Sequence, residues 1–374
     1  MDRTPLDQSA LRQIAAQFAI DGNVVDASPY GTGHINDTYA LTLAAGTLRT
    51  RYIFQKINTR IFTNVDALMS NISRVTAHVR RKLEAIPGAD LVRGTLTVIP
   101  TRANTAYLRT DTGDCWRCYL FIEGARTFDV LTAPRQAYEA ARAFGTFQGM
   151  LADLPAPPLH EIIPFFHHTP RRFQKLEEAL RIDVKNRAAS AAADLAFCRE
   201  REPLTHTVVN DLENGALPWR VTHNDTKINN VMLDDATGAG IAVIDLDSVM
   251  PGSILYDFGD EMRTSIGHFA ENERDLSKVF VDLEYFDQLV AGYLSSARAT
   301  LTKREIELLV FSGILITFTI GIRFLTDYLQ GDVYFRTHRD GENLDRARTQ
   351  FALVRSIEQN RDAMEKLVLK HLRT

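Results

Sequence analysis

A polar segment, Thr222–Asn230, followed by an acidic strand end at Asp245, most constrains what this chain can fold into. Apolar residues flank the polar segment, and the run Ile241–Ile244 leads directly into Asp245. The stretch Asp234–Gly238, between two short β-type runs, is typical of a β-hairpin. We therefore expect a loop and the hairpin after it to bring their polar side chains together.

These side chains have the chemistry that phosphoryl transfer requires. The loop offers Asp225, then Lys227 two residues on and Asn230 five residues on. The hairpin returns Asp245 beside them. Phosphoryl transfer uses a carboxylate near the acceptor hydroxyl, a positive group near the phosphates and oxygen ligands for Mg²⁺. A polar turn and an acidic strand end would explain any one of these residues, but not the ordered set.

The loop resembles the catalytic loop of the kinase-like superfamily, in the form found in aminoglycoside phosphotransferases and choline kinases. The shared pattern is His-x-Asp-x-x-x-x-Asn, here His223, Asp225 and Asn230, with a metal-binding Asp one hairpin later. The resemblance implies that Asp225 is the catalytic base and that Lys227 lies near the transferred phosphate. It also implies that Asn230 and Asp245 bind Mg²⁺, while His223 braces the loop from inside.

Two other aspartates could be mistaken for the metal ligand. Asp257-Phe258-Gly259 spells the metal-binding string of protein kinases, but it stands far beyond the hairpin. We expect Asp257 to cap a helix or to anchor the catalytic loop. Asp247 is two residues from Asp245, which predicts the same strand face and a supporting position behind the metal ligand.

The part of the chain before Gly124 is expected to bind the nucleotide. Gly31 and Gly33 precede a β-type run, which fits a loop whose backbone amides approach phosphates. In the kinase pattern, the strand after the hairpin carries a Lys for the α- and β-phosphates. Here Gln55 takes that position, and Lys56 follows it and faces the opposite side. Either a bulge lets Lys56 serve, or Gln55 serves and other groups bind the phosphates.

Two further features belong to the same expected nucleotide site. The predicted helix 64–83 lacks a central Glu that could pair with such a Lys, and Ser73 sits in its middle. The residues Phe121, Ile122 and Glu123 would form the hinge between two lobes, whose backbone holds the adenine of ATP in this superfamily.

The order of elements predicts an α+β fold. A helix is expected at 5–20, and β-type runs and one long helix fill the rest of the first part, at 38–43, 52–57, 64–83, 96–100 and 116–122. Helices are expected to dominate after Gly124, at 134–151, 170–180, 188–202 and from 275 onward. With the resemblance, this implies a bilobal protein-kinase-like fold. An N-terminal nucleotide-binding lobe with an antiparallel sheet would span 1–124, and a mostly helical catalytic and acceptor-binding lobe would span 125–374.

Composition narrows the class of protein. Its 43 basic and 47 acidic residues give a net charge of −4, which argues against a nucleic-acid partner. The apolar window 311–325 is too short to cross a bilayer, so no membrane partner is expected. Three cysteines and no secretory pattern at the N-terminus predict a cytoplasmic protein. We expect a monomer or a weak homo-oligomer.

The cysteines themselves carry no expected chemistry. Cys115 and Cys118 form a Cys-x-x-Cys string at the start of a predicted strand, with no second pair elsewhere. Residues three apart on a strand face opposite ways, so we expect structural roles rather than a redox or zinc site. Cys198 is expected to be buried in a helix.

The acceptor is expected to bind in the C-terminal helical part. Arg323 lies in the most apolar helix, where a charge costs free energy unless it is paired or used. A pair with Asp327 at i,i+4 explains it as well as a ligand role does.

The resemblance is closer to the bacterial N-acetylhexosamine 1-kinases. It rests on five blocks spread over nearly the whole chain, namely 30–36, 221–227, 244–247, 250–253 and 323–329. It implies ATP-dependent phosphorylation of the C1 hydroxyl of N-acetylglucosamine or N-acetylgalactosamine. Arg323 and Tyr334 would hold the sugar, with His34 near it.

Two other readings stay open. A kinase of the same fold could act on choline, homoserine or an aminoglycoside, and an acidic acceptor pocket would favour it. A non-catalytic nucleotide-binding module is the third reading, and Gln55 is its best support. The intact set of Asp225, Asn230 and Asp245 argues against that third reading.

Overall fold

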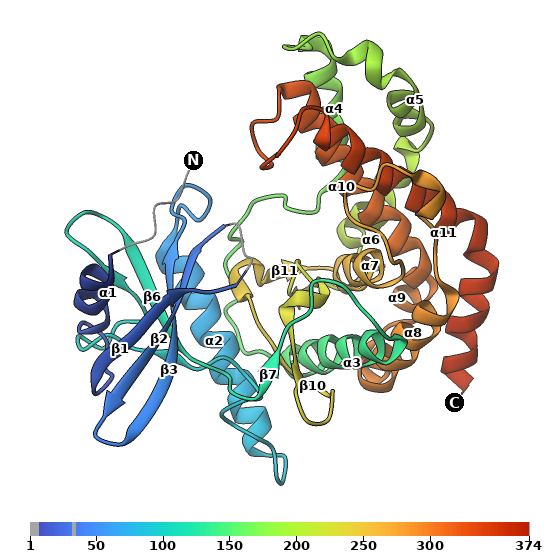
Figure 1. The fold of residues 1–374 in the computed structure, drawn as a ribbon. Coiled ribbons are helices and arrows are strands. Elements are labelled where there is room, and N and C mark those ends of the chain that lie inside the picture. The colour runs from blue at the N-terminus through green and yellow to red at the C-terminus, as the bar shows by residue number, and fades with distance from the viewer. Residues whose placement is uncertain (1–6, 32–34, 374) are drawn as a thin grey trace.

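The computed structural model describes residues 7–31 and 35–373 (Figure 1). Two of the expected site residues, Gly33 and His34, therefore lie outside the described residues.

The first part of the chain forms an antiparallel sheet, whose strands differ in length, with a helix on each face. The strand order is β1-β2-β3-β6-β4, and β5 pairs with β6. The helix α1 packs on one face and α2 on the other (Figure 1). The bounds are α1 (Gln8–Ala15), β1 (Asn23–Pro29), β2 (Asp37–Ala45), β3 (Leu48–Ile57), α2 (Val65–Glu84), β4 (Val98–Ile99), β5 (Leu108–Arg109) and β6 (Cys115–Leu120).

Alternation of side chains gives the sheet its two cores. On β3, Phe54 faces α1 and contacts Phe18 edge to face, with ring centroids 5.3 Å apart. Ile57 lies three residues after Phe54, so it points to the opposite face and packs toward α2. The helix predicted at 64–83 and the strands predicted at 38–43 and 52–57 are confirmed, whereas the runs 96–100 and 116–122 are strand only at Val98–Ile99 and up to Leu120. The strand β1 was not predicted, because its residues are mostly exposed and show no apolar alternation.

The helix predicted at 5–20 is only partly right. The structure ends α1 at Ala15, and the chain then turns so that Phe18 is fully buried and bridges to Thr101. Phe18, which suggested a longer helix, is therefore a core residue of the turn that follows α1.

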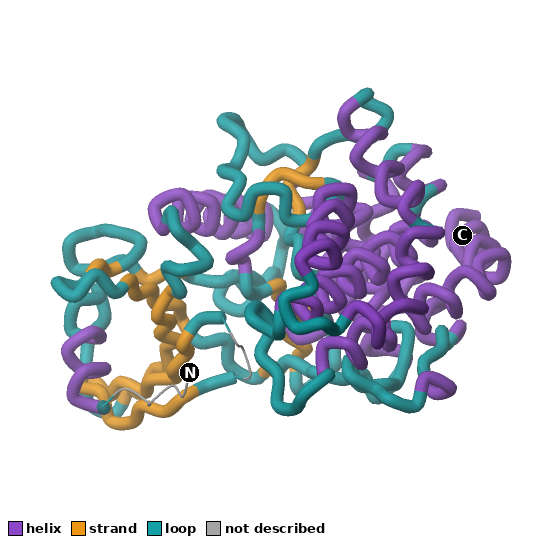
Figure 2. Tube along the Cα trace, turned by 90° about the horizontal axis from the view of Figure 1, so that it is seen from above, coloured by secondary structure: helices purple, strands orange, loops and turns teal. Residues whose placement is uncertain are grey.

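The second part of the chain is mostly helical (Figure 2). Its helices are α3 (Pro134–Leu151), α4 (Thr169–Ile182), α5 (Ala192–Glu200), α6 (Thr207–Glu213), α7 (Ile254–Ser265), α8 (Leu283–Ala297), α9 (Lys303–Glu307), α10 (Leu309–Gln330) and α11 (Glu342–Arg373). Two small sheets lie beside them, β10-β9-β7 and β11-β8. Their strands are β7 (Ala125–Arg126), β8 (Arg220–Thr222), β9 (Val231–Asp234), β10 (Gly240–Val243) and β11 (Met250–Gly252). This arrangement confirms the α+β fold with a small sheet lobe and a larger helical lobe. The exact boundary at Gly124 stays a prediction.

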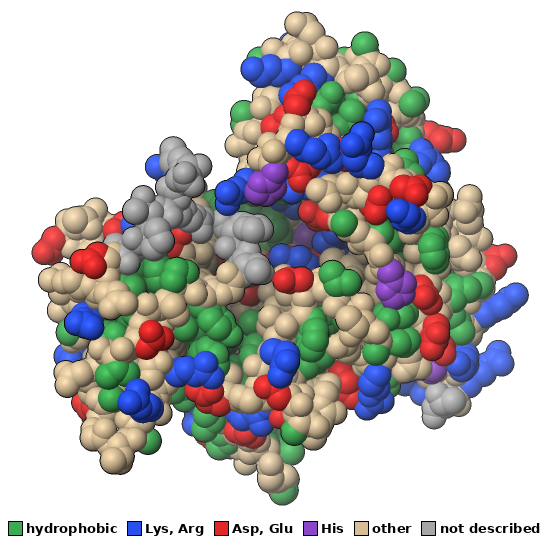
Figure 3. Space-filling view, viewed as in Figure 1, with side chains coloured by type: hydrophobic (Ala, Val, Ile, Leu, Met, Phe, Trp, Pro, Cys, Tyr) green, Lys and Arg blue, Asp and Glu red, His purple; other side chains and the backbone are tan. Residues whose placement is uncertain are grey.

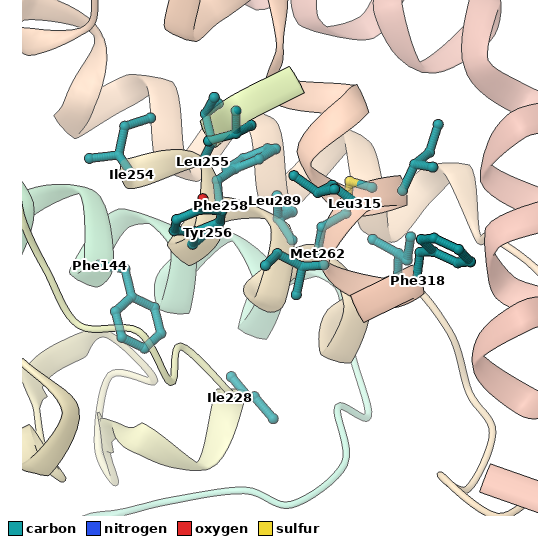
Figure 4. Packing of buried hydrophobic residues seen from close by; sticks show 14 of the residues in the cluster. Phe144, Ile228, Ile254, Leu255, Tyr256, Phe258, Met262, Leu289, Leu315 and Phe318 are labelled. Atoms are coloured by element: carbon teal, nitrogen blue, oxygen red, sulfur yellow. The ribbon is translucent and has the colours of Figure 1, made fainter. Parts of the chain in front are cut away.

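The helix α10 forms the centre of the larger lobe. It runs beyond the apolar window 311–325 expected from the sequence, and its length and composition would allow it to cross a membrane. However, 83% of its most apolar stretch is buried inside the protein, as expected of a core helix. Leu315 and Phe318 of α10 pack with Phe258 and Met262 of α7 (Figure 4). The predicted catalytic loop contributes Ile228 to the same core cluster.

Candidate active site

The backbone of the predicted catalytic loop is fixed by one buried carboxylate. Asp257, in the first turn of α7, accepts hydrogen bonds from the N–H groups of His223 (2.9 Å) and Asn224 (2.7 Å). Gln148 of α3 donates a third at 2.9 Å. Asn224 has a left-handed conformation (φ 65°), so the loop turns sharply just before Asp225. The prediction that Asp257 anchors the loop is confirmed, and the metal-ligand reading of Asp257-Phe258-Gly259 finds no support.

His223 braces the loop from inside, as predicted. Its ring is buried and lies edge-on to Phe144 and Phe147 of α3. Its Nε2 donates to the carbonyl of Ile244 at 2.9 Å, and its Nδ1 accepts from the N–H of Asp225 at 3.3 Å. One side chain thus ties the loop to the residue before Asp245.

The structure brings three of the predicted site residues into direct contact. The Nζ of Lys227 lies 3.2 Å from Oδ2 of Asp225. The side-chain amide of Asn230 donates to the backbone carbonyl of Asp225 at 2.7 Å and to its carboxylate at 3.1 Å. Burial opposes the charge on Lys227, but the carboxylates of Asp225, Asp260 and Asp245 outweigh it and raise its pKa. Lys227 therefore stays positively charged beside Asp225.

Asp245 stands where β10 ends, in a left-handed conformation (φ 58°). The expectation that Asp245 and Asp247 share a strand face is wrong, because a 3-10 turn, Leu246–Ser248, begins directly after Asp245. Burial, together with the carboxylates of Asp247 and Asp225, raises the pKa of Asp245 to about 6. No three acidic, His or Cys side chains among the described residues are arranged to hold a metal ion, but a divalent cation beside Asp245 would relieve the repulsion between these carboxylates. The oxygens of Asp245 and Asn230 are of the type that Mg²⁺ prefers.

The hinge residues pack between the glycine-containing loop and the hairpin. Phe121 lies under the guanidinium of Arg51 (3.7 Å to the ring centroid) and beside the ring of Tyr30, at 5.4 Å. Arg51 also pairs with Glu123, so the side chain of Glu123 is already occupied. Ile122 packs against Met232 and Ala242 of the hairpin strands β9 and β10. Tyr30 directly precedes Gly31, which has φ 77° and therefore a conformation that favours glycine.

The structure separates the two candidates for the phosphate contact. The β3–β6 register runs without a bulge from Tyr52 to Ile57, so Lys56 stays on the face opposite Gln55. Lys56 pairs there with Asp114, at 2.8 Å. Gln55 donates to the hydroxyl of Thr38 at 3.0 Å and accepts from Nε of Arg117 at 2.9 Å. The bulge that would let Lys56 serve is therefore absent from this part of the described chain.

Arg117 is a site residue that the sequence reasoning missed. It lies directly opposite Gln55 in the β3–β6 ladder and is only 1% exposed. Its Nη1 lies 2.5 Å from Oδ1 of Asp247, which raises its pKa against the cost of burial. Asp247 also accepts from the side-chain amide of Asn36 at 2.6 Å. The available signal was a charged residue within the apolar run 115–120, but the Cys-x-x-Cys pattern around it obscured this signal.

The helix α2 contacts the segment after Asp245 through an amide rather than a Glu. Asn71 is fully buried, and its amide donates to the carbonyl of Val249 at 3.0 Å and to that of His160 at 2.8 Å. A buried cation from β6 and a buried amide from α2 thus join the small lobe to the segment after Asp245.

The predicted burial of Cys198 and the opposite orientation of Cys115 and Cys118 are confirmed. Cys115, Cys118 and Cys198 are buried and free, and burial raises the pKa of each thiol. Cys115 belongs to the α2 side of the sheet and Cys118 to the α1 side.

In the acceptor region, the structure brings Arg323 and Tyr334 together. The guanidinium of Arg323 lies 5.9 Å from the ring centroid of Tyr334, 5.4 Å from that of Phe335 and 5.5 Å from that of Phe166. The alternative explanation, a pair with Asp327, is wrong. Asp327 instead accepts from the backbone N–H groups of residues 333–335, which holds Tyr334 beside Arg323.

His167 connects this region to the catalytic loop and was also missed. Its Nε2 donates to the carbonyl of Asn224, directly before Asp225, at 3.0 Å. Burial lowers the pKa of His167 to about 4, so the ring is neutral at physiological pH. Figure 3 shows Lys and Arg side chains, with a few acidic ones, where the surface is hollowed between the two lobes.

Comparison with known proteins agrees with this geometry. The profile of a family described as the phosphotransferase enzyme family matches residues 26–276. An aminoglycoside phosphotransferase from Alicyclobacillus acidocaldarius has a similar fold (TM-score 0.61, 13% identity, 100% of this chain and 98% of that one). So does a choline kinase from Cryptosporidium parvum (0.58, 16%, 97% and 98%). Spectinomycin phosphotransferase, solved with ADP and spectinomycin, is a third (0.56, 12%, 96% and 99%). These likenesses confirm the predicted kinase-like fold.

Proposed function

Because the chain belongs to the phosphotransferase enzyme family, we propose that it is an ATP-dependent kinase acting on the C1 hydroxyl of N-acetylhexosamines. The class of acceptor is inferred from one observation, the lack of a negatively charged partner for Arg323. Within the described residues, aromatic rings surround this guanidinium and it pairs with no carboxylate. Such a site suits an acceptor that offers oxygen atoms and no positive charge.

Asp225 is the residue proposed to activate the acceptor. Its backbone is held by His223 and Asn230, and its carboxylate contacts the amide of Asn230 and the ammonium of Lys227. In this position it can orient the C1 hydroxyl and accept its proton. Lys227, kept charged by the neighbouring carboxylates, neutralises charge that develops on the transferred phosphoryl group.

Asn230 and Asp245 are proposed to hold Mg²⁺. When bound, the ion would offset the negative charge of the nucleotide phosphates. Burial and the carboxylates of Asp247 and Asp225 raise the pKa of Asp245, and a bound cation would oppose both effects. Positively charged Arg117 and Lys227 act in the same direction as such a cation.

The nucleotide is proposed to bind between the two lobes, with its adenine at Phe121, Ile122 and Glu123. Gly31 and Gly33 would approach the phosphates. Gln55 stands where the superfamily carries a Lys, and Arg117, which donates to it at 2.9 Å, supplies a cation beside it. Similar structures solved with ADP and with GDP support a purine nucleotide.

Choline and aminoglycosides are the alternative acceptors, because two of the similar structures are a choline kinase and a spectinomycin phosphotransferase. Both alternatives carry positive charge, which an arginine without a carboxylate partner would repel. We expect the enzyme to work in the cytoplasm as a monomer or weak homo-oligomer. Three buried free thiols agree with a reducing compartment.

A panel of acceptors assayed with Mg-ATP tests the proposal. The panel comprises N-acetylglucosamine, N-acetylgalactosamine, glucose, choline, homoserine and an aminoglycoside, and the product is examined for a C1 phosphate by NMR. Turnover confined to N-acetylhexosamines is the expected result. Preferred turnover of choline or an aminoglycoside would reject the acceptor assignment, and no turnover of any acceptor would favour a non-catalytic module.

The variant Asp225→Asn tests the base. We expect kcat to fall by about 10²–10⁴-fold, because proton transfer by a positioned group contributes that much. Thermal unfolding should be unchanged, since the anchor of the loop is Asp257 rather than Asp225. Retained turnover in this variant would remove Asp225 from the proposed role.

A further inference from the structure

A second arginine lies beside Arg323 and has no assigned role. Arg172 is in the first turns of α4, which packs against α10, the helix that carries Arg323. Both side chains converge on Phe166: Nη2 of Arg172 donates to its carbonyl at 2.8 Å, and Arg323 lies over its ring. The two guanidinium groups therefore share one neighbour on the segment that leads into α4.

Neither arginine has an acidic partner among the residues at 7–31 and 35–373. The hydrogen bonds of Arg172 go to the carbonyl of Phe166, and the neighbours of Arg323 are aromatic rings. Burial and the charge of Arg323 together lower the pKa of Arg172 to about 10, against the opposing effect of Tyr334. By contrast Arg187, which also reaches this end of α10, pairs with Asp332 and Asp340. The pair is thus an uncompensated concentration of positive charge.

The arginine pair is connected to the catalytic loop through His167. This residue follows Phe166 in sequence and donates from Nε2 to the carbonyl of Asn224, directly before Asp225. Its Nδ1 is buried and has no hydrogen-bond partner in the described part of the chain. Both arginines lower the pKa of His167, so their charges reach this ring. A molecule whose hydroxyl lies at Asp225 would extend toward this charge.

We propose that Arg172 binds the acceptor together with Arg323 and sets its charge specificity. The two guanidinium groups bind oxygen atoms of an uncharged acceptor, such as its acetamide carbonyl and ring hydroxyls, and repel an ammonium group in their place. The inference rests on the proposed function. It explains why the site would take an N-acetylated hexosamine and reject the free amino sugar, which differs chiefly in that one positive charge.

The test compares Arg172→Gln and Arg172→Lys with the unchanged enzyme. The acceptors are N-acetylglucosamine, glucose and glucosamine, assayed at about pH 6, where the free amine is charged. In Arg172→Gln we expect KM for N-acetylglucosamine to rise about tenfold, while KM for ATP stays unchanged. The preference for glucose over glucosamine should shrink about tenfold, because one repelling charge is gone. Arg172→Lys should keep that preference but not the low KM for N-acetylglucosamine.

Arg171→Gln is the matched control. Arg171 is the neighbouring residue in α4, and its substitution removes the same charge. Its guanidinium lies 3.4 Å from the ring centroid of Phe165, away from the contact with Phe166 that Arg172 and Arg323 share. We expect its kinetics to match those of the unchanged enzyme. Arg172→Lys retains a donor for the carbonyl of Phe166. If Arg172→Gln does not fold, the kinetics of Arg172→Lys decide the test.

The outcomes separate the two proposals. If the unchanged enzyme phosphorylates N-acetylglucosamine but Arg172→Gln alters neither its KM nor the rejection of glucosamine, the Arg172 inference is overturned alone. If the unchanged enzyme phosphorylates no N-acetylhexosamine at all, the proposed function and the inference fail together. If Arg172→Gln and Arg171→Gln behave alike, net charge rather than position explains the effect, and the inference is overturned.

Discussion

The protein places buried or half-buried arginines on both sides of Asp225, and the two sides treat them in opposite ways. On the nucleotide side, Arg117 is almost fully enclosed and pairs with Asp247 at 2.5 Å. On the acceptor side, Arg172 and Arg323 face one another's charge, with no carboxylate partner among the described residues.

The difference distinguishes an arginine that stabilises the fold from arginines that are available to bind a ligand. A buried charge costs several kcal/mol unless it is paired, so a paired arginine belongs to the internal structure of the protein. An unpaired one keeps its hydrogen-bonding capacity for something outside the chain. Arg117 therefore joins the sheet to the turn after Asp245, whereas the Arg172–Arg323 pair is available to the proposed acceptor.

The largest expected effect is a loss of stability when the pair between Arg117 and Asp247 is broken. Arg117→Gln leaves Asp247 buried without its cation, and we expect the free energy of unfolding to fall by about 3–5 kcal/mol. Chemical denaturation measures it. Arg126→Gln is the control, because Arg126 and Asp235 form an exposed pair worth about 0–1 kcal/mol. Equal losses in the two variants would contradict an internal role for Arg117.

The next effect is a pH dependence on the unpaired side. In the folded protein the pKa of His167 is about 4, lowered by burial, whereas its ordinary value is 6.5. As pH falls below 6.5, the unfolded chain takes up this proton before the folded chain does. Stability is therefore complete above pH 6.5 and is lost toward pH 4, by up to about 3 kcal/mol. Urea unfolding of the unchanged protein and of His167→Gln across this range should diverge; parallel curves would argue against it.

A smaller effect concerns binding rather than stability. Arg323→Gln should raise KM for the acceptor about 10–100-fold, because a hydrogen bond from a charged group is worth about 1.5–3 kcal/mol. The free energy of unfolding should change by less than about 0.5 kcal/mol, since no carboxylate loses a partner. Steady-state kinetics with ATP and acceptor varied separately measures the first quantity. A large loss of stability would place Arg323 with Arg117 instead.

The smallest expected effect concerns Lys56. Its pair with Asp114 is about one-third exposed and lies on the face away from Gln55. Lys56→Gln should therefore leave KM for ATP within about twofold and stability within about 0.5 kcal/mol. A tenfold rise in KM for ATP would restore Lys56 as a phosphate contact.

The sequence predicted the parts of the site that are close together along the chain. Asp225, Lys227 and Asn230 lie within six residues, so their spacing alone indicated their contact. The anchoring role of Asp257 was predicted because its position, far beyond the hairpin, did not suit a metal ligand.

The remaining contacts depend on how distant segments pack. Arg117 and Asp247 are 130 residues apart, and nothing local to either indicates the other. Asp327 failed as the partner of Arg323 because three backbone N–H groups compete for its carboxylate, and that turn could not be foreseen from i,i+4 spacing. Gly33 and His34 remain predictions outside the described residues.

The alternation of β6 has a consequence for insertions and deletions. Cys115, Arg117 and Tyr119 face α2 and the larger lobe, while Trp116 and Cys118 belong to the core beneath α1. A one-residue slip of this strand would exchange the two sets, moving a guanidinium into an apolar core and an indole toward Asp247. The turn before β6, between Thr110 and Asp114, should therefore tolerate substitution far better than any change in its length.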